Sequence, residues 1–182
     1  MTALDKSALA VTRFWREAGE DAWFEKNDAF DADFRSRFLD LHFAAARREC
    51  DAWSEHAEGS LALMILLDQF PRNCFRGCGH MYATDPLARH FAARAIAAGH
   101  DLALEEDLRV FLYLPYEHSE LPADQHRSVE LTTARAPEYI KYAVEHRDII
   151  ERFGRFPHRN KMLGRETTAD EQIFLDGGGF SG

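Results

Sequence analysis

Cysteine is scarce in this chain of 182 residues, which holds three thiols, at positions 50, 74 and 78. A small, odd number of cysteines is typical of proteins that keep free thiols in a reducing compartment. The first residues also lack the apolar core of a signal peptide and carry a charged Asp5 early. These absences predict a cytoplasmic protein without a disulfide framework.

Long apolar runs and β-branched runs are also missing. The longest apolar run, Leu61 to Leu67, is far shorter than the roughly 20 residues that a helix needs to cross a bilayer. Valine is scarce, which disfavours β-sheet. Phenylalanine, in contrast, occurs 14 times in an alanine-rich chain, as in helices that pack large rings into small gaps. We therefore expect an all-α protein with no membrane partner.

Positive charge is in deficit, because the formal net charge is -9. An acidic chain has no general attraction for nucleic acid or for anionic membranes, so we expect neither as a partner. One segment departs from this balance: Arg152 to Arg165 reads RFGRFPHRNKMLGR and contains no acid. Such a basic segment indicates either an anion site or a solvated loop after a helix, and both interpretations remain open.

Apolar periodicity and capping residues predict about eight helices, with short connections that favour antiparallel hairpins. Pro71 is expected to end the third of them, because a proline disfavours helix in the residue before it. No linker rich in proline, glycine or serine divides the chain, so we expect one domain over residues 1–182 with a flexible tail at 176–182. The expected helices cover residues 5–18, 28–53, 59–69, 85–99, 104–113, 124–133, 137–153 and 168–175.

The segment Ser60 to Gly77 divides into an apolar half and a polar half. The apolar half predicts a central helix that is buried on all sides. Asp68 falls at the negative end of that helix, where a carboxylate needs a cationic partner, and Arg72 or an arginine distant in the sequence is the obvious candidate. The candidate binding residues of the polar half are Asp68, Gln69, Arg72 and Asn73.

A second Phe-Pro sequence, Phe156 to Asn160, repeats the pattern late in the chain. Arginine offers a planar fork of donors that suits carboxylate or phosphate, so two such segments predict a clamp for an anionic small molecule or peptide. The alternative is a brace, in which the arginines pair with acids inside a buried ion-pair network. The further candidate binding residues are Glu117, His118, Arg155, His158, Arg159 and Asn160.

Catalysis is a third interpretation of the same residues. Glu117 and His118 are candidates for an acid–base pair, and His158 for a general base, in a hydrolase or transferase with Arg72 and Arg159 as anion stabilisers. His146 lies on an apolar helix face and is expected to be a core histidine. The cysteines have no second metal-binding pair, and no glycine-rich phosphate loop occurs, so we expect neither a metal nor a cofactor.

Four ordered motifs resemble a bacterial family, domain of unknown function 924. They are LLDQFPRN (66–73), YLPYEHSE (113–120), HRDIIERFGRFPHRN (146–160) and LGRETTADEQIFL (163–175). The resemblance implies a tetratricopeptide-like superhelical fold and implies no activity. It marks the binding candidates named above, together with Ser119, as motif positions. Tyr116 departs from the family pattern, in which phenylalanine is expected.

Overall fold

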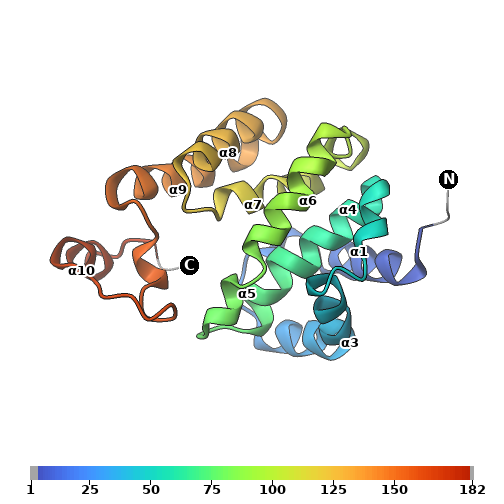
Figure 1. Cartoon of the computed structure of the whole chain (residues 1–182), viewed down its shortest axis with the longest axis horizontal. Coiled ribbons are helices and arrows are strands. Elements are labelled where there is room, and N and C mark those ends of the chain that lie inside the picture. Colours follow the sequence, from blue (N-terminus) through green and yellow to red (C-terminus); the bar gives the residue numbers. More distant parts are fainter. Residues whose placement is uncertain (1–3, 181–182) are drawn as a thin grey trace.

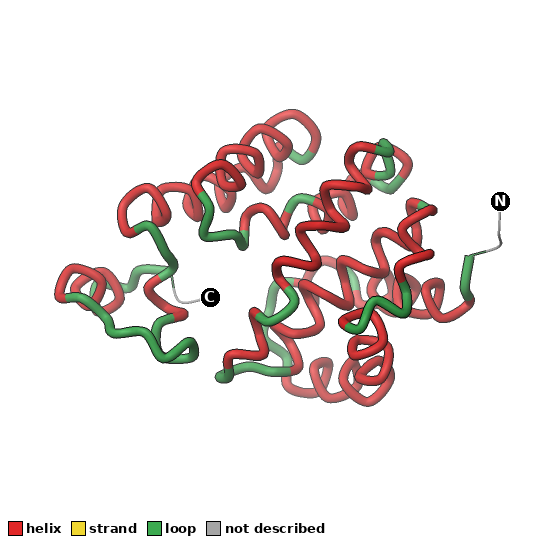
Figure 2. The backbone as a smooth tube through the Cα atoms, viewed as in Figure 1, coloured by secondary structure: helices red, strands yellow, loops and turns green. Residues whose placement is uncertain are grey.

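All regular structure in the described part of the chain, residues 4–180 of the computed structural model, is helical (Figures 1 and 2). The all-α prediction is therefore confirmed. No helix among these residues is both long and apolar enough to cross a membrane. The helices are α1 (Lys6–Ala18), α2 (Glu20–Trp23), α3 (Asp28–Ala46), α4 (Ala57–Met64), α5 (Phe70–Cys74), α6 (Asp85–Ala97), α7 (Leu114–Glu117), α8 (Pro122–Arg135), α9 (Ile140–Phe153) and α10 (Ala169–Asp176).

Helix α4 lies at the centre of the larger part of the molecule, with α1 and α6 packed against it, and α3 packs against the turn and the helix α5 that continue it (Figure 1). Every residue from Leu61 to Leu67 is fully buried, as the apolar run predicts. Glu58 at the start of α4 binds Arg16 in the last turn of α1. Ser60, two residues later, bonds to His100 just after α6. Helices α1 and α6 therefore both run antiparallel to α4.

A second and smaller apolar core lies at the other end of the molecule. Helices α8 and α9 form a hairpin, in which His126 near the start of α8 meets Glu151 near the end of α9 at 3.3 Å. Ile149 and Ile150 of α9 pack with Phe156 in a cluster that is separate from the main core. The chain between these two cores includes α7, so the polar residues at the end of α7 lie where the two cores adjoin.

The prediction that Pro71 ends the third helix is wrong. The helix continues from α4 through a π-helical turn, Ile65–Gln69, into α5. The Phe70 N–H donates to Ile65 O, five residues back, and Pro71 has no N–H. The carbonyl of Leu66 therefore loses both of the backbone donors that could reach it. Single π turns of this kind occur frequently at functional sites.

Side chains from other parts of the fold supply the missing donors. His42 Nδ1 lies 2.8 Å from Leu66 O, and the Thr84 hydroxyl donates to Leu67 O at 2.5 Å. Arg72 Nη1 donates to Asp68 O at 2.9 Å. Three consecutive carbonyls of the π turn are thus satisfied, which allows the helix to pass through a proline without leaving buried acceptors unpaired.

Thr84→Val should lower the free energy of unfolding by about 1–3 kcal/mol, because the buried Leu67 carbonyl loses its donor while the side-chain shape is kept. The matched control is Thr133→Val, whose exposed hydroxyl donates to Val129 O and whose loss should cost less than about 0.5 kcal/mol. Urea denaturation measures both. Equal losses in the two variants would contradict a specific role for Thr84 in supporting the π turn.

Several predicted helix ends also shift. Asn27 rather than Asp28 caps α3. That helix ends at Ala46 rather than near residue 53, and Arg48 follows with a left-handed φ of 68°. The predicted helix at 104–113 is a 3₁₀ helix, Glu106–Leu112. The capping box predicted at Thr168 is confirmed. Residues 181 and 182 of the expected tail lie outside the described residues.

Candidate functional site

Asp68 is the centre of a buried polar cluster. It lies on the π turn and is fully buried. Its Oδ1 is 2.8 Å from His118 Nδ1 and 3.1 Å from Arg72 Nη1, and Gln69 Nε2 donates to Oδ2 at 2.6 Å. Burial alone would raise the pKa of Asp68, but Arg72 and His118 outweigh burial and lower the pKa to about 2. Asp68 is therefore ionised and has the cationic partner that the sequence predicts.

Arg72 joins Asp68 to the start of α6. Its two terminal nitrogens donate to the two oxygens of Asp85 at 2.8 and 3.0 Å. Burial would lower the pKa of Arg72, but Asp68 and Asp85 raise it. The guanidinium group thus makes several short bonds to the protein itself. For Arg72 the brace interpretation describes the geometry well.

Arg159 reaches the same acid but does not bond to it. It lies at the end of the 3₁₀ turn Pro157–Arg159, and its Nη1 is 3.6 Å from Asp85 Oδ2, beyond hydrogen-bond distance. Its guanidinium carbon lies 4.6 Å from the ring centroid of Tyr82 and 4.3 Å from that of Phe156. Burial and the charge of Arg72 lower the pKa of Arg159 to about 10.

Arg159 forms no side-chain hydrogen bond with the described residues, which is unusual for a buried arginine. The residue is only 6% exposed, and its Nε is buried without a hydrogen-bond acceptor. Among the described residues, no acceptor lies within hydrogen-bond distance of the guanidinium group. Buried charges in proteins are normally paired and hydrogen-bonded. Arg159 is therefore a cation with unused donors beside two aromatic rings.

Glu117 ends α7 and is 3% exposed. It accepts no hydrogen bond from the described residues, and the nearest basic atom is His146 Nδ1 at 3.4 Å. That nitrogen is 2.9 Å from the Tyr142 carbonyl, which it can reach only as a donor. Burial and the charge of Asp68 raise the pKa of Glu117 to about 8. The carboxyl group is therefore largely protonated at pH 7.

His118 follows Glu117 directly and is oriented by Asp68. Burial, with the charge of Arg72, lowers the pKa of His118 despite the nearby carboxylate. The neutral ring donates through Nδ1 to Asp68, so its Nε2 carries a lone pair. No described residue bonds to that Nε2. The end of α7 thus presents a proton donor and a proton acceptor on neighbouring residues.

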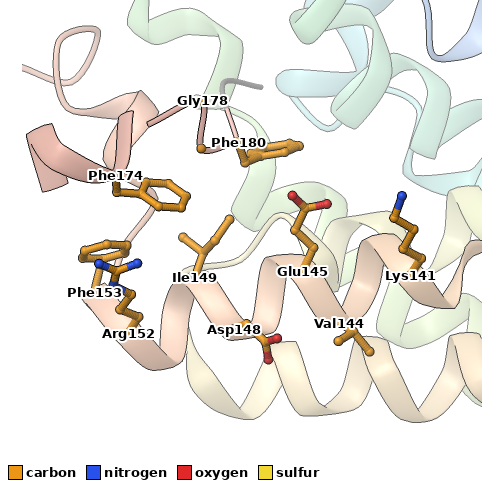
Figure 3. Close-up of a pocket in the computed structure, with 11 residues that line it drawn as sticks. Lys141, Val144, Glu145, Asp148, Ile149, Arg152, Phe153, Phe174, Gly178 and Phe180 are labelled. Carbon is orange, nitrogen blue, oxygen red and sulfur yellow. The ribbon is translucent and has the colours of Figure 1, made fainter. Parts of the chain in front are cut away.

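Phe180 covers the histidines on the side of α9. Its ring centroid lies 4.5 Å from that of His146 and 5.2 Å from that of His158. Burial lowers the pKa of both histidines to about 3. Phe180 also lines a cavity of about 470 Å³ between α9 and α10, together with Ile149 and Phe174 (Figure 3). One side chain therefore borders both the cavity and the polar cluster.

Phe180→Ala should raise the pKa values of His146 and His158 towards the ordinary value of 6.5, because water would reach both rings. NMR titration of the histidine side chains measures both values. The ring signals of the exposed His126, which lies on α8, serve as an internal control for the titration. Unchanged pKa values for His146 and His158 would show that residues other than Phe180 exclude water from the two rings.

The remaining predicted site residues lie elsewhere and bind other parts of the fold. Asn73 Nδ2 donates to Asp31 Oδ1 at 2.7 Å and so joins α5 to α3. Arg155 and Asn160 both donate to Glu171, the N3 residue of the α10 capping box. The structure therefore brings together Asp68, Gln69, Arg72, Glu117, His118, His158 and Arg159, and separates Asn73, Arg155 and Asn160 from them.

Three residues of the cluster are absent from the sequence-based candidates. Asp85 shows only a helix-start pattern in the sequence, although it faces both arginines. Tyr82 lies in a 3₁₀ turn without any motif. Phe180 follows a run of glycines that gives no sign of packing. Within residues 4–180, no group of three or more histidine, cysteine or acidic side chains is placed to hold a metal.

A family model and a solved structure both match this chain. No curated protein matches this sequence. A solved structure of a protein of unknown function from Agrobacterium tumefaciens shares 60% sequence identity with this chain, with a TM-score of 0.91. The match covers 93% of this chain and 97% of that one. The family model described as "Bacterial protein of unknown function (DUF924)" matches residues 11–179, and the chain belongs to that family.

Proposed function

We propose that this protein binds a small anion at Arg159. The observation that carries the proposal is the buried guanidinium group, which is 6% exposed and has no hydrogen-bond partner among the described residues. An anion would accept the unused donors and would remove the cost of burying a guanidinium group without hydrogen bonds. The acid nearest to Arg159 is Asp85, which already binds Arg72 through both oxygens.

The surroundings favour a carboxylate or phosphate group on a small molecule or peptide. A guanidinium group presents paired donors that match both groups, and such charge-assisted bonds are about twice as strong as neutral ones. Tyr82 and Phe156 lie close to the guanidinium group and restrict its movement, so little conformational entropy would be lost on binding. Glu117 is largely protonated near neutral pH, which limits repulsion of the anion.

The wider fold suits a binding protein. The helical hairpins are consistent with the tetratricopeptide-like arrangement that the family resemblance implies, and the three free cysteines with a reducing cytoplasm. Phe180 packs against His146 beside the polar cluster and also lines a cavity of about 470 Å³.

Isothermal titration with succinate and with inorganic phosphate tests the proposal. The wild-type protein should bind one of them, and Arg159→Met should weaken that binding by at least tenfold, which corresponds to about 1.4 kcal/mol. The matched control is Arg152→Met, which removes the same charge from the wall of the neighbouring cavity and should leave the affinity within about twofold. Equal affinity in wild-type and Arg159→Met proteins, or the absence of binding for both anions, would contradict the proposal.

A further inference from the structure

Asp68 and His118 form a hydrogen-bonded pair that anion binding at Arg159 does not require. Asp68 is held by Arg72 and Gln69 as well as by His118, so the carboxylate is fixed in position before it orients the imidazole. A histidine that donates Nδ1–H to a buried carboxylate has its tautomer set and its Nε2 ready to accept a proton. A purely structural histidine would be expected to bond through Nε2 as well.

Glu117 is the second feature that neither bracing nor binding explains. Its carboxyl group is buried at the end of α7 and accepts no hydrogen bond among residues 4–180. Removing a carboxyl group from water without giving it a hydrogen-bond partner is unfavourable. Buried acids that lie beside a histidine and have a raised pKa are typical of sites that transfer protons.

We propose that the anion site hydrolyses an ester whose acyl part carries a carboxylate. Arg159 binds the carboxylate of the substrate, His118 acts as the general base on water, and Glu117 acts as the general acid on the leaving alcohol. Asp68 is a positioning residue, because it acts only through His118. This inference rests on the proposed binding of an anion at Arg159.

The proton transfers balance over one turnover. The oxygen of a water molecule attacks the ester carbonyl carbon while His118 Nε2 takes a proton from that water. The bond between the carbonyl carbon and the alkoxy oxygen then breaks, and Glu117 gives its proton to the departing oxygen. The products are an alcohol and a dicarboxylic compound. His118 now carries an extra proton and Glu117 lacks one, so a proton passing from His118 to Glu117 restores both groups.

The charge states of the free protein suit these roles. Glu117 keeps its proton up to a pH of about 8, and His118 stays neutral because burial lowers its pKa. Arg72 and Arg159 increase the positive charge near the reacting centre and would stabilise the negative charge that develops on the carbonyl oxygen. We therefore expect a bell-shaped pH profile that falls on the alkaline side as Glu117 loses its proton.

Two esters with the same acyl group distinguish the role of His118 as general base from that of Glu117 as general acid. Mono-4-nitrophenyl succinate has a good leaving group that needs no proton, whereas monoethyl succinate has a poor one. The wild-type protein should hydrolyse both, as measured by absorbance and by NMR. His118→Gln should slow both reactions by about 10²–10⁴-fold. Glu117→Gln should slow the ethyl ester by a similar factor and leave the nitrophenyl ester within about threefold.

The controls distinguish a loss of catalysis from misfolding and from a failure of anion binding. His126→Gln changes an exposed histidine and should leave both rates unchanged, and circular dichroism confirms that each variant is folded. No turnover of either ester by wild-type protein that binds succinate would overturn the hydrolysis alone. Phosphate binding without succinate binding would likewise overturn the hydrolysis alone, and no binding of either anion would overturn both proposals. Rates that survive both His118→Gln and Glu117→Gln would overturn the assigned roles.

Discussion

Arg72→Met should destabilise the fold by about 3–5 kcal/mol, because it leaves the carboxylates of Asp68 and Asp85 without their cation. Asp68 is fully buried, and Arg72 bonds to both oxygens of Asp85. Methionine keeps much of the side-chain volume, so the loss reports on charge rather than on packing. The change also removes the donor to the Asp68 carbonyl on the π turn. Urea denaturation at pH 7 measures the difference.

Arg37→Met is the matched control for that variant. Arg37 pairs with Asp33 one helical turn away on α3, and both side chains are largely exposed. Exposed pairs of this kind contribute about 0.3–0.5 kcal/mol. A loss of less than about 1 kcal/mol for Arg72→Met would contradict the account of a buried ion pair that holds α5 against α6.

Glu117→Gln should change how stability depends on pH. The pKa of Glu117 is about 8 in the folded protein and 4.5 without the fold, so the native state holds an extra proton between those values. Stability from this group is therefore complete below about pH 4.5 and is lost as the pH rises through 8. The shift corresponds to about 4–5 kcal/mol over that range. Glutamine mimics the protonated acid, so the variant should exceed the wild type in stability at pH 8.5 and match it near pH 4.5.

The measured quantity is the difference between the free energies of unfolding of wild type and Glu117→Gln at each pH. His118, His146 and His158 have lowered pKa values and lose stability in the opposite direction, as the pH falls below 6.5. Their contribution is shared by both proteins and largely cancels in the difference. A constant difference between wild type and Glu117→Gln from pH 4.5 to 8.5 would show that Glu117 titrates normally.

The sequence predicts the buried centre of this fold and the need of Asp68 for a cation, because both follow from residues close together in the chain. The continuation of the helix through Pro71, in contrast, does not follow from residues close together in the chain. The donors that satisfy the π turn come from His42 on α3 and from Thr84 before α6. Only the folded structure brings them to the carbonyls, so no local pattern predicts a helix that continues through this proline.

The two Phe-Pro segments are alike in sequence but fold differently. Arg72 follows its proline on an α-helix, whereas Arg159 ends a 3₁₀ turn. The two arginines meet at Asp85, but the asparagines that follow them diverge, Asn73 towards Asp31 and Asn160 towards Glu171. Arg72 therefore bonds to both oxygens of Asp85, whereas Arg159 bonds to neither. The sequence gives no sign of this difference, because it depends on where each segment lies relative to Asp85.

The most direct test of the central claim follows the Arg159 side chain itself during addition of succinate or phosphate. In protein with ¹⁵N-labelled arginine, the Nε–H signal of Arg159 is identified by its absence from Arg159→Met. Because Arg159 Nε has no acceptor among the described residues, that signal should move downfield and exchange more slowly with water once the anion binds. The signal of Arg152 should stay in place. An Arg159 signal that does not move at saturating concentrations of either anion would contradict the claim.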